Sequence, residues 1–102
     1  MVEKTVYGIT AVRYSGNQIV EAMMGLVDEN MNRWDVGPAP TRVVGVVDRL
    51  VEGDTVITLF PHDDGGFEAG PQVLVDVLAE GTETLALDFE TPGKRLADLP
   101  RF

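Results

Sequence analysis

Apolar and polar residues alternate in part over the first segment of the chain, which is the spacing of a β-strand. Residues 5–14 are rich in β-forming residues and predict a strand. Residues 15–17 read Ser-Gly-Asn, a turn sequence whose glycine tolerates a positive φ. Residues 18–27 leave two alternatives, because their Glu, Ala and Met favour a short helix while the preceding turn and the internal glycine favour a second strand. We expect the strand.

The hydrophobic period changes in the middle of the chain. Residues 33–36 predict a short third strand, and Gly-Pro-Ala-Pro at 37–40 ends it. Apolar residues then recur at three- and four-residue steps, which predicts an amphipathic helix over about residues 40–52 with Gly53 as its C-terminal cap. Valine has a weak helix propensity, so packing on the sheet must stabilise this helix. The expected apolar stripe consists of Val43, Val44, Val47, Leu50 and Val51.

The alternating pattern returns after the helix. Residues 55–60, 73–78 and 85–89 predict three strands in an antiparallel meander with one solvated face, separated by turn-rich segments. We expect apolar residues of the tail from 94 to 102 to pack back on the body of the protein. The fold class is therefore α+β, a single mainly antiparallel sheet of five to six strands packed against one central helix. Residues 1–102 are expected to form one small domain.

Composition and charge narrow the classes of partner. The chain has no cysteine, no signal-peptide pattern at its start and no apolar run of about 20 residues, so we expect a cytoplasmic protein. The net charge is −9, and no Lys or Arg lies between Arg49 and Lys94. Such a surface repels phosphate backbones and anionic lipid, which argues against nucleic-acid and membrane binding. The charge serves solubility or forms an acidic face for a basic protein segment or a cation. The acids of this stretch are Glu52, Asp54, Asp63, Asp64, Glu68, Asp76, Glu80, Glu83, Asp88 and Glu90.

The densest group of potential metal ligands is His62, Asp63 and Asp64, followed by Glu68. Imidazole and carboxylate groups can share a cation, but this spacing matches no known metal loop. Adjacent Asp residues before two glycines are also typical of a solvated turn, and we expect the turn, with no metal and no cofactor. The only serine, Ser15, is not set in a nucleophile elbow, so no catalytic residue is assigned.

A second candidate binding group is an arginine beside aromatic residues. Arg13 lies in the first predicted strand, near Tyr7 and Tyr14 in sequence, and Trp34 is the only tryptophan. Arginine and aromatic rings together can hold an anion or a planar ligand. The alternative is an arginine paired with a local acid and a tryptophan that belongs to the core.

Three landmarks resemble a family of small bacterial domains of unknown function. They are Ile-Thr-Ala-Val-Arg at 9–13, the helix that ends at Gly53, and Leu-Ala-Asp-Leu-Pro at 96–100. The resemblance covers nearly the whole chain. It implies a bacterial or phage source and a small domain that stands alone, and it implies no activity.

We therefore expect an uncharacterised acidic domain that works as a non-enzymatic binding or interaction module, through an acidic sheet face or an exposed strand edge. Its expected partner is a basic protein or a second copy of the chain. The alternative is a small-molecule or metal-dependent enzyme with a cleft near His62, Asp63, Asp64 and Arg13. A mimic of DNA charge is a third class.

Overall fold

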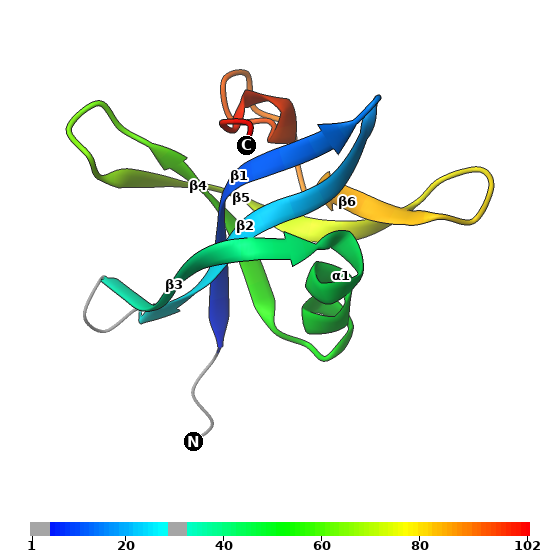
Figure 1. The fold of residues 1–102 in the computed structure, drawn as a ribbon, viewed down its shortest axis with the longest axis horizontal. Helices are drawn as coiled ribbons and strands as arrows, with labels where there is room; N and C mark the ends of the chain where they lie inside the picture. Colours follow the sequence, from blue (N-terminus) through cyan, green and yellow to red (C-terminus); the bar gives the residue numbers. More distant parts are fainter. Residues whose placement is uncertain (1–4, 29–32) are drawn as a thin grey trace.

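A six-stranded sheet and a single α-helix make up the part of the chain that the computed structural model describes, residues 5–28 and 33–102 (Figure 1). The predicted α+β class, the strand count and the mostly antiparallel pairing are confirmed, and residues 18–27 form a strand. The strand order in the sheet is β3-β2-β1-β4-β5-β6. No helix among the described residues has the length and the apolar run needed to cross a membrane. The elements in chain order are β1 (Val6–Ser15), β2 (Gln18–Asp28), β3 (Arg33–Arg42), α1 (Val43–Val51), β4 (Thr55–Pro61), β5 (Phe67–Val77), β6 (Glu83–Leu87) and the 3₁₀ turn η1 (Leu96–Asp98).

One strand pair is parallel, so the sheet is mixed. β1 pairs with β4 in parallel from Val6↔Thr55 to Ile9↔Thr58, whereas the other strand pairs are antiparallel. Parallel neighbours cannot be joined by a tight turn and need a crossover connection. α1 supplies it, because it carries the chain from the edge strand β3 to the far side of β1.

The predicted end of the third strand at Gly37 is wrong, and so is the helix start near residue 40. β3 continues through Pro38 and Pro40 to Arg42, and α1 begins at Val43. Proline lacks the N–H that an interior strand donates to its neighbour, but an edge strand has one side without a partner. β3 is the edge strand of the sheet, so two prolines are tolerated there.

The predicted apolar stripe of the helix is partly wrong. Val46 and Val47 are buried, while Val44 and Val51 are 63% and 74% exposed. The buried stripe, at i, i+3, i+4 and i+7 spacing, faces the sheet and contains Val43, Val46, Val47 and Leu50. Gly53 ends the helix as predicted, with φ +95°.

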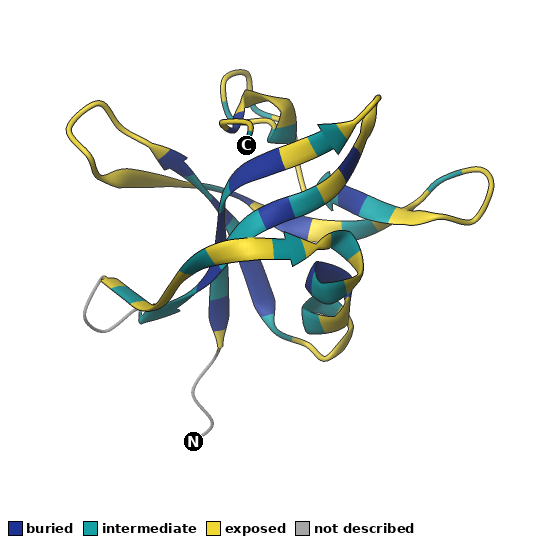
Figure 2. Cartoon of the chain, viewed as in Figure 1, coloured by how far each residue is buried: buried dark blue, intermediate teal, exposed yellow. Residues whose placement is uncertain are grey.

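The main core lies between α1 and one face of the sheet, and Figure 2 shows buried residues both in α1 and in the strands. Thr58 is a buried polar residue in this region, and its hydroxyl donates to the Pro71 carbonyl at 2.9 Å. The buried residues of the cluster are Ile9, Val12, Ile19, Ala22, Val46, Val47, Val56, Phe60, Val73, Leu85 and Leu99.

β5 begins earlier than predicted and changes partner along its length. It starts at Phe67, pairs with β4 as far as Gln72, and then pairs with β6 from Val73 to Val77. The sequence pattern of residues 67–72 contains Gly and Pro and does not alternate, which hid this half of the strand.

The tail returns to β1, as expected. Leu99 is only 2% exposed, and the Val12 N–H donates to the Pro100 carbonyl at 2.9 Å while the Phe102 N–H donates to the Val12 carbonyl at 3.2 Å. β4 pairs with β1 only as far as Ile9. The tail therefore takes the place beside β1 that β4 leaves.

Candidate functional site

Arg13 lies at the β1–β2 hairpin and is already engaged. Its guanidinium is 3.3 Å from a Glu21 carboxylate oxygen, donates to the Phe102 carbonyl at 3.2 Å, and lies 4.7 Å from the centre of the Phe102 ring. Arg13 is opposite Glu21 on β2, whereas Trp34 is opposite Val27, six residues further along. At ~3.3 Å per residue that separation is about 20 Å, so Arg13 and Trp34 do not form one site.

His62, Asp63 and Asp64 are exposed in the loop between β4 and β5. The loop is a hydrogen-bonded turn, in which the His62 N–H donates to the Gly66 carbonyl at 2.7 Å and the Gly66 N–H donates to Asp64 Oδ1 at 2.9 Å. In Figure 1 this loop and the tip of the β1–β2 hairpin project in different directions, and the contacts of Arg13 are with Glu21 and Phe102. Across residues 5–28 and 33–102, no three His, Asp or Glu side chains are grouped so that they could hold a metal ion.

Glu68 connects this loop to the tail. His62 Nε2 is 3.7 Å from Glu68 Oε2, and the Lys94 ammonium contacts the other carboxylate oxygen. The hydrogen bond from Lys94, followed by its positive charge, lowers the pKa of Glu68. The group lies at the surface, and its Lys94–Glu68 ion pair joins the tail to β5.

Trp34 lies on the face of the sheet opposite α1, over two glycines. A Cβ added at Gly25 would be 2.7 Å from Trp34 Cζ3, and one added at Gly8 would be 3.2 Å from Trp34 Cη2. β1 and β2 pair Gly8 with Gly25, so the two glycines form one gap in the side chains of this face. The indole and the Leu59 side chain occupy that gap, which only glycine leaves open.

The Trp34 indole also meets Phe67, from a strand that is distant in the sheet. The ring centres are 6.1 Å apart with an interplanar angle of 83°. β2, β1 and β4 separate β3 from β5, which in a flat sheet would place them about 19 Å apart at ~4.8 Å per strand. The sheet is therefore curled, with Trp34 and Phe67 on the inside of the curl.

A hollow of about 530 Å³ opens beside these two aromatic side chains, and both of them line it. Ligand pockets commonly have volumes of about 300–1,000 Å³. Phe67 is 44% exposed, and Trp34 is half-buried. We call this site the aromatic hollow, and it is lined by Val27, Arg33, Trp34, Leu59, Gly66, Phe67 and Ala69.

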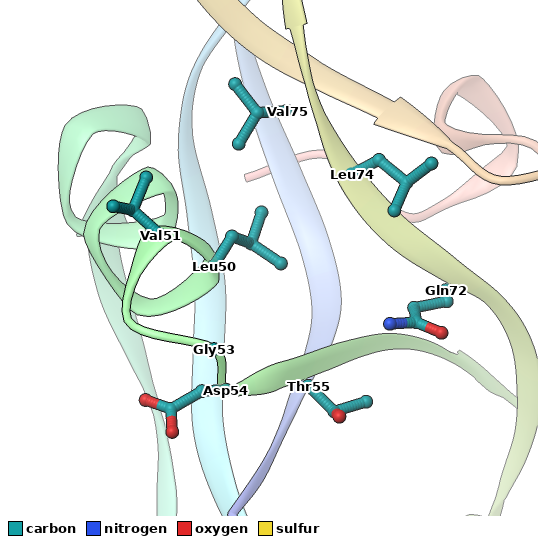
Figure 3. A pocket seen from close by; sticks show the side chains of 8 residues that line it. All are labelled: Leu50, Val51, Gly53, Asp54, Thr55, Gln72, Leu74 and Val75. Carbon is teal, nitrogen blue, oxygen red and sulfur yellow. The ribbon is translucent and has the colours of Figure 1, made fainter.

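A second hollow, of about 350 Å³, lies on the α1 side where the end of the helix approaches β5 (Figure 3). Leu50 points from α1 toward β5, and the Asp54 carboxylate points away from the other side chains. Its lining is mixed, with aliphatic residues such as Leu50 and Val75 beside the polar Thr55 and Gln72. It has no aromatic ring and no charged group directed into it, so it is the weaker candidate.

Sequence reasoning selected Trp34 but missed its partners. Phe67 falls in a segment that the sequence predicts as turn-rich, and Arg33 is predicted only as the start of the short third strand. The available signal was the pair of glycines inside the first two predicted strands, because an interior glycine marks a close approach.

Comparison with known protein families, with characterised proteins and with solved structures finds no match. The resemblance of residues 9–13 and 96–100 to a family of small bacterial domains therefore stays a prediction.

Proposed function

We propose that this chain is a non-enzymatic binding module and that the aromatic hollow is its ligand site. The observation that carries the proposal is the contact between Trp34 and Phe67, which come from strands far apart in the sheet and together line a hollow of about 530 Å³. Both rings keep solvent exposure, although an aromatic residue that only fills a core is normally covered. We prefer a binding module to the enzyme alternative because His62, Asp63 and Asp64 do not converge with Arg13. The proposal includes the cytoplasmic location that the sequence predicts.

The test uses Trp34 as a local reporter. Trp34 is the only tryptophan, so the protein has one indole N–H signal in an NMR spectrum and one source of tryptophan fluorescence. Fragments that include aliphatic and aromatic, neutral and charged members are titrated into the folded chain. We expect a subset to shift the Trp34 signal in a saturable way.

A matched pair of variants tests whether the fragments bind in the aromatic hollow. Phe67→Ala removes one wall of the hollow and should weaken binding about tenfold, the upper range for one aromatic contact. Phe89→Ala removes a ring that is 58% exposed and does not line the hollow, so it should leave binding unchanged. If no fragment shifts the Trp34 signal, or if both variants bind equally, the aromatic hollow is not the ligand site.

A basic protein segment is the second candidate partner, at the hairpin formed by the end of β5 and β6. Asp76, Glu80 and Glu83 are exposed on this hairpin, which projects from the body of the sheet in Figure 1. No Lys or Arg occurs in residues 50–93, so these carboxylates attract a cationic segment. The diagnostic result is a partner that dissociates as salt is raised and that binds Glu80→Gln and Glu83→Gln variants more weakly. Sedimentation over a range of protein concentrations distinguishes this partner from self-association of the chain.

A further inference from the structure

We infer that the aromatic hollow binds a small planar aromatic molecule that carries a carboxylate, with Arg33 as the partner of the anionic group. The inference rests on the proposed function and adds the chemical class of the ligand. Three properties of the hollow lead to it, namely the angle between its rings, its aliphatic lining and the sign of its charge.

The angle between the two rings favours a flat ligand. The Trp34 and Phe67 rings meet at 83°, so they form two perpendicular walls of one corner. A planar aromatic group that stacks on one wall presents its edge to the other, and aromatic pairs prefer these two arrangements. A globular aliphatic group would contact the corner through only part of its surface.

The remaining lining favours an apolar ring. Val27, Leu59 and Ala69 provide aliphatic surface, and Gly66 lines the hollow from the loop after β4. A molecule with one or two fused rings fits a volume of about 530 Å³, and the side of it that faces the lining would be removed from water.

The charge of the lining favours an anion. The chain contains 17 acids and 8 bases, yet the lining of the hollow contains Arg33 and no acid. Asp28 lies opposite Arg33 in the β2–β3 pairing, and no ion pair within 4 Å joins Arg33 to another described residue. A guanidinium binds a carboxylate through two parallel hydrogen bonds, and it lies here at the border of an apolar site. The overall charge of −9 repels anions at a distance, so the preference depends on this local group.

The experiment compares three probes that share one ring system. They are 2-naphthoate, its neutral amide 2-naphthamide, and the cation 2-naphthylmethylammonium, each titrated into the full chain while the Trp34 indole N–H signal is followed by NMR. Arg33 is exposed, so its ion pair with the ligand is worth about 1 kcal/mol, or about fivefold in affinity. We expect 2-naphthoate to bind about fivefold more tightly than the amide and the cation to bind most weakly.

Two arginine variants test the assignment of Arg33. In Arg33→Gln the ratio between 2-naphthoate and the amide should fall to about one. Arg42→Gln changes an exposed arginine at the other end of β3 and removes the same charge, so it controls for the loss of net charge. It should leave the ratio near five. Equal loss in both variants would overturn the role of Arg33.

The outcomes also separate this inference from the proposed function. If the amide or the cation binds as tightly as 2-naphthoate and Phe67→Ala weakens all three, the hollow is a ligand site and the inferred charge of its ligand is wrong. If aliphatic fragments bind and the three naphthyl probes do not, the planar class is wrong. If no fragment and no probe shifts the Trp34 signal, the proposed function fails together with the inference.

Discussion

The aromatic hollow depends on the glycine beneath Trp34, and Gly25→Ala tests that dependence. A Cβ at residue 25 would lie 2.6 Å from the Val36 carbonyl oxygen, 2.7 Å from Trp34 Cζ3 and 2.8 Å from the Pro38 nitrogen. Two of these three atoms belong to the backbone of β3, which pairs with β2 along most of its length. A side chain could rotate away from the new methyl group, but a paired strand must shift as a whole.

The expected cost follows from this geometry. Inserting a methyl group into a packed site costs roughly 1–3 kcal/mol, and obstruction by backbone places Gly25→Ala in the upper half of that range, at about 2–3 kcal/mol. For a domain of this size, such a loss lowers the melting temperature by about 10 °C or more. The same shift moves Trp34 away from β2, so ligand binding in the hollow should fall as well.

Gly37→Ala is the matched control, because it makes the same chemical change in β3 where a Cβ meets nothing within 4 Å. Its free energy of unfolding should stay within about 0.5 kcal/mol of the unmodified chain, or rise slightly because alanine restricts the unfolded state. Gly8→Ala should lie between the two, since the nearest atom to its Cβ is a Leu59 methyl carbon at 2.5 Å, and a side-chain end can move.

Urea denaturation followed by Trp34 fluorescence and by circular dichroism measures all three variants on one scale. Equal urea midpoints for Gly25→Ala and Gly37→Ala would show that β3 and Trp34 do not pack on Gly25. The curled shape described for the sheet and the position of the aromatic hollow would then both be wrong.

Three further predictions concern the core, the acid stability and the tail. Val46→Ala should lower the free energy of unfolding by about 2–3 kcal/mol because Val46 is fully buried, whereas Val44→Ala on the exposed side should change it by less than about 0.5 kcal/mol in the same urea assay. The backbone N–H and the guanidinium of Arg95 lower the pKa of Asp98 from its ordinary value of 3.8. The stability that the ionised Asp98 carboxylate contributes is therefore present above pH 3.8 and is lost as the pH falls through the lower pKa of the folded state. Asp98→Asn should therefore lose less stability than the unmodified chain when both are titrated from about pH 5 to pH 2; an equal loss would exclude this contribution. Leu99→Ala should cost about 2–4 kcal/mol, because Leu99 is 2% exposed, and hydrogen exchange should show faster opening of the tail; unchanged exchange would mean that the tail is held elsewhere.

The sequence predicted most strands correctly because their hydrophobic patterns are local. The exceptions have physical causes. Pro38 and Pro40 indicate the end of a strand wherever every N–H must find a partner, and they were misleading because β3 lies at the edge of the sheet. Which strand lies at the edge is a property of the whole fold, so no local pattern contains it.

The predicted apolar stripe of α1 was partly wrong for a different reason. α1 contains valine at both Val43–Val44 and Val46–Val47, so several stripes with three- and four-residue steps are consistent with its sequence. The position of the sheet decides which valines are buried, and it selects Val46 and exposes Val44. Hydrophobicity alone could not distinguish two identical side chains.

The aromatic hollow required knowledge of the tertiary structure. Trp34 and Phe67 are far apart in sequence, lie on strands with three others between them, and meet only because the sheet curls. The glycines at 8 and 25 were visible in the sequence as gaps within strands, but nothing there indicates which side chain fills them. The alternation of residues along a strand predicts which face of the sheet each side chain lies on. A site formed by distant strands depends instead on how the whole sheet curls.

The two faces of the sheet differ in what they contribute to stability, and that difference supports a binding function for the aromatic hollow. The α1 side contains the buried core. The other face has two interior glycines, each of which weakens a strand by roughly 0.5–1 kcal/mol, and a phenylalanine that remains 44% exposed. Exposed apolar surface also increases the risk of association, so stability alone does not account for this arrangement. A ligand that covers Phe67 does account for it, because the apolar surface is then buried only in the bound state.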